Sequence, residues 1–149
     1  MKTLRLFFAT IATAALVSFT GCKQQADKPA DTDNGTENIQ HTSNVYVLPQ
    51  GATFDVNKAP EVLTIIDFNA TWCGPCKQFA PIFDKASSTY DGKVKFISVD
   101  VDLHEDLARQ LNIQSIPAVL FIKPDGTQEW SIGFMEEEEF CSKIDAALL

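Results

Sequence analysis

The sequence predicts an α/β domain built on a central mixed sheet, with parallel strands followed by an antiparallel C-terminal hairpin and with flanking helices. Two nearly continuous apolar runs, 63–68 and 94–99, are typical of buried parallel strands. Amphipathic helical stretches follow both runs. Pro124-Asp125-Gly126 then separates two further strand-like runs, which indicates a hairpin.

The first half of the folded segment contains three predicted strands and one helix. Residues 45–48 form a short β-rich run that Pro49 ends, and the two apolar runs give the next strands. A helix is expected after Cys76, and Pro81 inside it is expected to cause a kink. Its apolar face consists of Phe79, Ile82, Phe83 and Ala86.

The second half contains two predicted helices around the hairpin. Asp102 and Glu105 have the spacing of a pair that caps a helix N-terminus. In that helix a leucine recurs every fourth residue, at Leu103, Leu107 and Leu111. The hairpin strands are expected at 118–122 and 128–132. The last helix starts near Glu136, and its apolar side contains Phe140, Cys141, Ile144 and Leu148. We expect Cys141 to be buried and to take no part in redox chemistry.

Length and charge limit the possible classes of function. The 149 residues suit one domain with additions, and an apolar content of 45% is ordinary for a globular protein. Twenty acidic and 12 basic residues give a formal charge of -8, which argues against nucleic-acid binding, because phosphates would be repelled. The acidic run 136–139 is interpreted as a solvated face. Four unevenly spaced cysteines are too few for a disulfide framework.

Residues 1–21 have the features of a secretory signal peptide. Lys2 and Arg5 precede an apolar run, 6–17, which is shorter than the roughly 20 apolar residues that a transmembrane helix needs. The end of the segment, Ser18-Phe19-Thr20-Gly21-Cys22, resembles the lipobox of bacterial lipoproteins, although Phe19 replaces the usual leucine. This resemblance implies that Cys22 is lipidated and becomes the new N-terminus. A plain signal peptide followed by an incidental Cys22 is the alternative.

The rest of the chain is expected to divide into a tether and a folded domain. Residues 22–44 are almost all polar or small, so they have little to bury and are expected to form a flexible tether that begins at lipidated Cys22. The folded domain covers 45–149. By resemblance to lipoproteins, Lys23 favours the outer membrane. We therefore expect the domain at the periplasmic face of a bacterial membrane.

Cys73-Gly74-Pro75-Cys76 lies between a predicted buried strand and a predicted helix. Two intervening residues let the sulfurs reach bonding distance across one helical turn. Cys73 is then at the helix N-terminus, where N–H groups and the dipole stabilise a thiolate, the form that attacks a disulfide. Half a zinc site is the alternative, but zinc needs two more ligands. No suitably spaced ligand exists among His41, His104 and Cys141, so we expect no metal.

The segment from Phe68 to Lys77, together with Pro81, closely resembles the thioredoxin family. Ser115-Ile116-Pro117 before a hydrophobic strand and Gly133 after the hairpin extend the resemblance over about residues 45–149. The resemblance implies the thioredoxin fold, with Cys73 as nucleophile and Cys76 as resolving cysteine of a redox disulfide. It implies no cofactor.

Further site residues follow from the same resemblance. Asp67 matches the family's buried carboxylate, which accepts the proton that Cys76 loses, and a strand-end aspartate in water is the alternative. Pro117 matches the family's cis-proline, and a trans proline at the start of an edge strand is the alternative. The residues expected to bind substrate are Trp72, Gly74, Pro75, Ile116 and Pro117.

Two positions depart from the family pattern. Asn69 stands where the family often has a second tryptophan, which makes the underside of the site more polar. Phe96 is aligned with a lysine that lies near the buried acid in bacterial cytoplasmic members. Asp67 is therefore expected to lack a charged partner, so that burial alone raises its pKa.

The resemblance leads to a specific functional hypothesis. Gly74-Pro75 is, by resemblance, the dipeptide of reducing members, whereas strong periplasmic oxidants usually carry a histidine there. We therefore expect a periplasmic protein-disulfide reductase, active as a monomer, whose partners are disulfide-bonded client proteins and a membrane protein that donates electrons. A thiol oxidase or disulfide isomerase is the first alternative. A non-catalytic substrate-binding module is the second.

Overall fold

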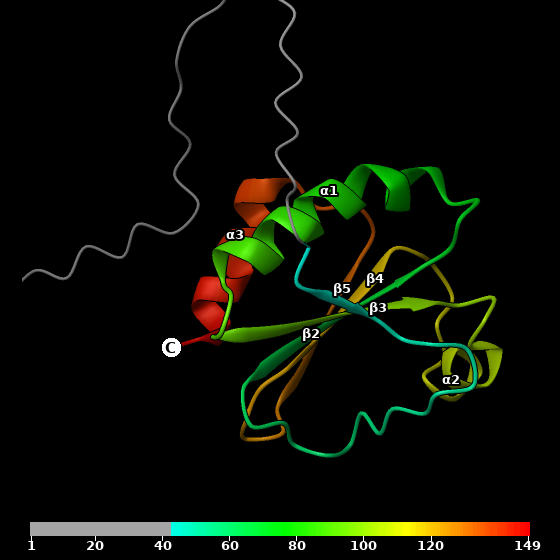
Figure 1. Cartoon of the computed structure of the whole chain (residues 1–149), viewed down its shortest axis with the longest axis horizontal. Coiled ribbons are helices and arrows are strands. Elements are labelled where there is room, and N and C mark those ends of the chain that lie inside the picture. The colour runs from blue at the N-terminus through cyan, green and yellow to red at the C-terminus, as the bar shows by residue number, and fades with distance from the viewer. Residues whose placement is uncertain (1–42) are drawn as a thin grey trace, which may run out of the picture.

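A computed structural model of the chain describes residues 43–149 (Figure 1). In chain order the elements of this range are β1 (Val45–Val47), β2 (Leu63–Asn69), α1 (Gly74–Thr89), β3 (Val94–Asp100), α2 (Glu105–Gln110), β4 (Ala118–Ile122), β5 (Gln128–Ile132) and α3 (Glu137–Ala147). The expected signal peptide 1–21, Cys22 and nearly all of the tether 22–44 lie outside the described residues, so those interpretations stay predictions.

The five strands form one mixed sheet in the order β1-β3-β2-β4-β5. β1 and β2 pair with β3 in parallel, whereas β4 runs antiparallel to both β2 and β5. In the β4–β5 turn, the backbone N–H of Gly126 donates to the carbonyl of Lys123, and Gly126 has a φ of 84°, which glycine adopts without a steric penalty. The predicted mixed sheet with a C-terminal hairpin is confirmed.

Helices cover both faces of the sheet (Figure 1). On one face, Phe79 and Phe83 of α1 pack against Phe140 of α3, and Phe83 also meets Phe96 of β3 edge to face. On the other face, α2 contributes Leu107 to a second apolar cluster. Within residues 43–149, none of the helices combines the length and the apolar character needed to cross a bilayer.

The central strand β2 is buried on both faces, and this burial positions the site. Side chains alternate along a strand, so Ile65 joins the cluster beneath α1 and α3, while Ile66 joins the cluster beneath α2. Both side chains are fully buried, and each such burial contributes about 1.5–3 kcal/mol to folding. The same alternation directs Asp67 toward α1, the helix that contains Cys76.

Two details at helix ends differ from the prediction. α2 begins at Glu105 with His104 as its N-cap residue and no side-chain cap, so the predicted capping pair of Asp102 and Glu105 is wrong. Leu103 lies before the helix and is 49% exposed. Leu148 follows the end of α3 and is 42% exposed. The predicted burial of Cys141 is confirmed, but its sulfur is disulfide-bonded, so the expectation of a thiol outside redox chemistry is wrong.

Candidate active site around Cys73 and Cys76

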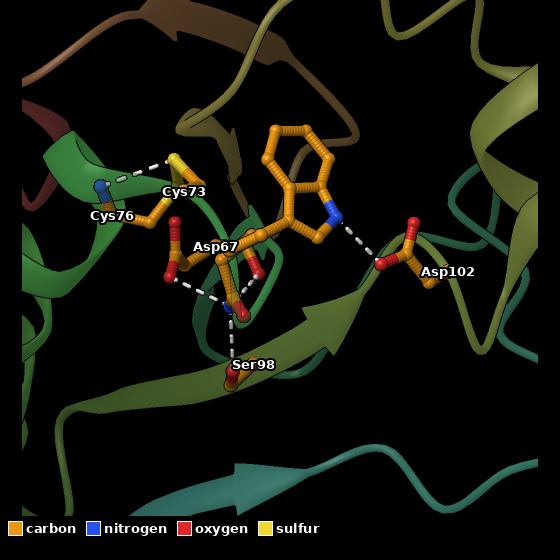
Figure 2. Close-up of a disulfide and its surroundings, with 7 residues drawn as sticks. Asp67, Cys73, Cys76, Ser98 and Asp102 are labelled. Carbon is orange, nitrogen blue, oxygen red and sulfur yellow. Dashed lines mark hydrogen bonds between the residues drawn. A yellow bond between two sulfur atoms is a disulfide. The ribbon is translucent and has the colours of Figure 1, made fainter.

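Cys73 and Cys76 lie where the chain leaves β2 and enters α1. Cys73 is the N-cap residue of α1 with extended backbone angles, and a proline occupies the first turn, where no N–H is missed. The two sulfurs are bonded at 2.05 Å. The backbone N–H of Cys76 donates to Cys73 Sγ over 3.2 Å (Figure 2). This N–H and the helix dipole stabilise negative charge on Cys73 once the disulfide is reduced.

The fold brings a distant loop against the cysteine pair. Both cysteines are buried, and Ile116 packs against them together with Ala70 and Val101. The peptide bond between Ile116 and Pro117 is cis, as the resemblance predicted. The carbonyl of Pro117 accepts the backbone N–H of Gly133 over 2.8 Å, so the two distant motifs noted in the sequence are joined.

Trp72 presents an aromatic surface beside the disulfide. Its side chain is 67% exposed, and its indole N–H donates to Asp102 Oδ2 over 2.8 Å (Figure 2). This hydrogen bond fixes the ring while it leaves the ring accessible. Trp72 and Ile116 line one groove of about 390 Å³, and the neighbouring Gly74 and Pro75 are exposed. Four of the residues expected to bind substrate are therefore at least partly exposed, whereas the fifth, Pro117, is buried.

Asp67 lies inside the protein next to the disulfide (Figure 2). The residue is only 4% exposed, which excludes the alternative of a solvated strand-end aspartate. Its Oδ2 accepts a hydrogen bond from Asn69 Nδ2 over 2.9 Å, whereas its Oδ1 is buried with no hydrogen-bond partner. Burial raises the pKa of Asp67 from 3.8 to about 7, and the hydrogen bond from Asn69 opposes that rise. Such an acid can take up and release a proton at neutral pH.

The predicted neighbour of Asp67 was wrong. The strand register pairs Asp67 with Ser98, whereas Phe96 pairs with Ile65 and is packed among apolar side chains. Phe96 is therefore displaced by two residues from the position beside the acid. Asn69 Nδ2 also donates to Ser98 Oγ over 2.8 Å. In the described part of the chain, the carboxyl of Asp67 accepts a hydrogen bond from the neutral Asn69, which lowers its pKa, so the expectation that burial alone sets this pKa is wrong.

A pocket of about 480 Å³ gives access to this network from the side of β1 and α1. Asp67, Cys76 and Ser98 all line it, and Lys77 and Asp84 contribute charged groups from α1. The pocket is large enough to hold water molecules, and Asp67, Asn69 and Ser98 offer them polar groups in a lining that is otherwise largely apolar. Across residues 43–149, no three His, Cys, Asp or Glu side chains are grouped so that they could hold a metal ion.

Sequence reasoning did not identify the parts played by Ser98 and Asp102. Both reach the site from segments distant in sequence, so no local pattern points to them. Asn69 was noted only as a departure from the family. Its spacing of two residues from Asp67 places both side chains on one face of β2, and that signal was available.

Comparisons with known proteins agree with this geometry. The family model described as Thioredoxin matches residues 45–146. A thioredoxin of Borreliella burgdorferi is 46% identical over 76 residues, which are 51% of this chain and 65% of that protein, just under two thirds of its length. A thioredoxin of Staphylococcus aureus is 33% identical over 97 residues, covering 65% of this chain and 92% of that protein.

Two solved structures are similar as well. The thioredoxin Mala s 13 of Malassezia sympodialis has a TM-score of 0.61 at 33% identity, covering 70% of this chain and 94% of that one. Chloroplastic thioredoxin z has a TM-score of 0.56 at 31% identity, covering 58% and 79%. The family match spans the whole sheet and the cysteine pair. The chain therefore belongs to the thioredoxin family, and Cys73 and Cys76 form the redox disulfide of a thioredoxin-type dithiol–disulfide oxidoreductase.

Proposed function

We propose that this protein reduces disulfide bonds of client proteins at the periplasmic face of a bacterial membrane. The observation that carries the chemistry is the Cys73–Cys76 disulfide at the N-terminus of α1, beside a buried acid whose pKa is about 7. The exposed ring of Trp72 supplies the apolar contact surface that a protein client requires.

The reaction proceeds through two thiol–disulfide exchanges. The Cys73 thiolate attacks one sulfur of the client disulfide, so a mixed disulfide forms and the other client sulfur leaves as a thiolate. Cys76 then gives its proton to Asp67, and its thiolate attacks the Cys73 sulfur. The mixed disulfide breaks, the Cys73–Cys76 bond forms, and the second client thiolate leaves. The client gains two electrons and the dithiol loses two, which yields the oxidised state seen in the structure.

The reducing direction is supported by the residues between the cysteines. Gly74 and Pro75 add no positive charge, so the Cys73 thiolate is stabilised by the helix N-terminus without help from an intervening histidine. A less stabilised thiolate makes the disulfide form comparatively stable, and the couple is then more reducing.

The location is supported by the N-terminal sequence. Cys22 after a basic and then apolar segment is the proposed lipid attachment point, with the outer membrane favoured by Lys23. In an oxidising compartment the dithiol must be regenerated, so we assign that task to a membrane protein that passes electrons across the bilayer. Anchoring would raise the effective concentration of the domain near that donor.

Insulin reduction tests the catalytic part of the proposal. With dithiothreitol as electron source, the wild-type protein should accelerate insulin precipitation, and Cys73→Ser should not. Asn57→Ser changes an exposed residue outside the cysteine motif and should retain the acceleration. Equal rates for wild type and Cys73→Ser would leave the binding-module alternative.

The redox state in growing cells tests the direction. Rapid acid quenching followed by thiol alkylation should show mostly reduced Cys73 and Cys76, and loss of the membrane donor should convert them to the disulfide. A fully oxidised pool in healthy cells would overturn the reductase assignment and favour the oxidase.

A further inference from the structure

The amide nitrogen of Asn69 donates to three acceptors. Its Nδ2 lies 2.9 Å from Asp67 Oδ2 and 2.8 Å from Ser98 Oγ, and a third contact of 3.3 Å reaches the backbone carbonyl of Asp67. A backbone carbonyl can only accept a hydrogen bond, so the nitrogen and not the oxygen of the amide must face Asp67. Because the amide has two N–H bonds, the three acceptors share them, and the two shortest contacts go to Asp67 Oδ2 and Ser98 Oγ.

This arrangement makes the two oxygens of Asp67 unequal. Oδ2 already accepts an N–H, so a proton on its Asn69 side would collide with that donor. Oδ1 is buried and has no hydrogen-bond partner. Figure 2 shows the Asp67 carboxyl between the disulfide and Ser98, and Asp67 and Cys76 line the same pocket. Oδ1, which accepts no hydrogen bond, is therefore the oxygen favoured to receive a proton, directly or through one water.

We propose that Asn69, held by Ser98, is a positioning residue that directs the proton of Cys76 to Oδ1 of Asp67. In the transfer, the S–H bond of Cys76 breaks and an O–H bond forms at Oδ1, with no change in electron count. The inference deepens the proposed function, since it concerns the resolving step of the same exchange reaction.

Among the groups of residues 43–149 around the Asp67 carboxyl, Asn69 is the one that stabilises its ionised form. The pocket wall from α1 contributes the titratable Cys76 and the charged Lys77 and Asp84, while β3 contributes the neutral Ser98. β1 lines the pocket with Val45 and Val47. Among the described residues, Asn69 makes the hydrogen bond that opposes the effect of burial on the pKa of Asp67.

The test is the pH dependence of the resolving step in the full-length protein. A mixed disulfide is formed at Cys73 with a chromogenic thiol, and its release by Cys76 is followed in single-turnover mode. Asn69→Leu removes both N–H donors, so the midpoint of the pH profile should move to higher pH. A hydrogen bond to an ionised group stabilises it by roughly the equivalent of one pKa unit. Because the pKa of Asp67 is about 7, a shift of that size lowers the ionised fraction of Asp67 at pH 7 about fivefold. The rate at pH 7 should therefore fall about fivefold and recover at alkaline pH. Asn57→Leu changes an exposed asparagine and should leave the profile unchanged.

Two companion measurements separate the possible outcomes. If Asn69→Leu does not fold, Asn69→Ala replaces it. Ser98→Ala keeps the hydrogen bond from Asn69 to Asp67, so it should move the midpoint of the pH profile less than Asn69→Leu does. The carboxyl ¹³C shift of Asp67, titrated by NMR, should report the same upward movement of its pKa without any client. A rate that falls equally at every pH, with an unmoved Asp67 titration, would overturn the inference and make Asn69 a purely structural bridge. A wild type inactive on insulin but with the expected NMR shift in Asn69→Leu would instead refute the proposed function alone.

Discussion

Asp67→Asn is expected to stabilise the oxidised protein at pH 8 and to change its stability little at pH 4. The pKa of Asp67 is about 7 in the folded protein, against an ordinary value of 3.8. Each pKa unit corresponds to about 1.4 kcal/mol, so the ionised carboxylate lowers the free energy of unfolding by about 4 kcal/mol at alkaline pH. The asparagine side chain is nearly isosteric and neutral, and its oxygen can accept the N–H of Asn69.

The sign of the pH dependence follows from proton binding. Between about pH 4 and pH 7 the folded state holds a proton on Asp67 that the unfolded state has lost. The free energy of unfolding of the wild type therefore falls as the pH rises through this window, relative to the variant. Below this pH window Asp67 is protonated in both the folded and the unfolded state, and above it Asp67 is ionised in both. The difference in the free energy of unfolding between wild type and variant is therefore constant on either side of the window.

Urea denaturation of the oxidised full-length proteins at pH 4 to 8 measures this difference. The gain for Asp67→Asn should rise from near zero to at least about 2 kcal/mol, with 4 kcal/mol as the upper limit set by linkage. Asp91→Asn, in an exposed turn, is the matched control and should show no such rise. A gain that is equal at pH 4 and pH 8, or a loss at pH 8, would refute the assignment of a buried acid with a raised pKa.

Three further outcomes are expected. Cys22→Ala should abolish labelling by radioactive fatty acid, and release of the wild type as an unlabelled protein would contradict the anchor. In the reduced protein, iodoacetamide should modify Cys73 at a lower pH than Cys76, because Cys73 accepts the helix N–H, and equal reactivity would remove the assigned roles. Asp102→Ala should release the indole of Trp72, increase its fluorescence depolarisation and raise the KM for insulin about threefold with kcat kept. An unchanged KM would mean that insulin binding does not depend on the hydrogen bond that orients the Trp72 ring.

The fold was predictable because its signals are local and agree with one another. The apolar runs in β2 and β3 could be satisfied only by burial on both faces, and the structure confirms both strands. The turn residues 124–126 marked the hairpin, which is also confirmed. The helix starting at the cysteine motif was correctly expected, since a proline in the first turn and the motif itself favour that start.

The errors arose where a distant contact overrides a local pattern. Asp102 and Glu105 have the spacing of a capping pair, yet Asp102 accepts the indole N–H of Trp72 instead. A hydrogen bond between residues so far apart in sequence leaves no trace in local periodicity. The position beside Asp67 was misassigned for a related reason, because the pairing of β2 with β3 fixes Ser98 there and the sequence of either strand alone does not fix the register.

The two polar residues near Asp67 are better understood as a pair than as separate departures from the family. A lysine beside the acid would favour the carboxylate by charge, whereas Asn69 favours it by one neutral hydrogen bond, which is the weaker effect. Asn69 can act in this way only if its second N–H has an acceptor, and Ser98 supplies that acceptor from the neighbouring strand. The acid consequently keeps a pKa of about 7, at which neither the protonated nor the ionised form dominates at neutral pH. The instability of the ionised carboxylate is then the same property that lets Asp67 take a proton from Cys76 and release it again.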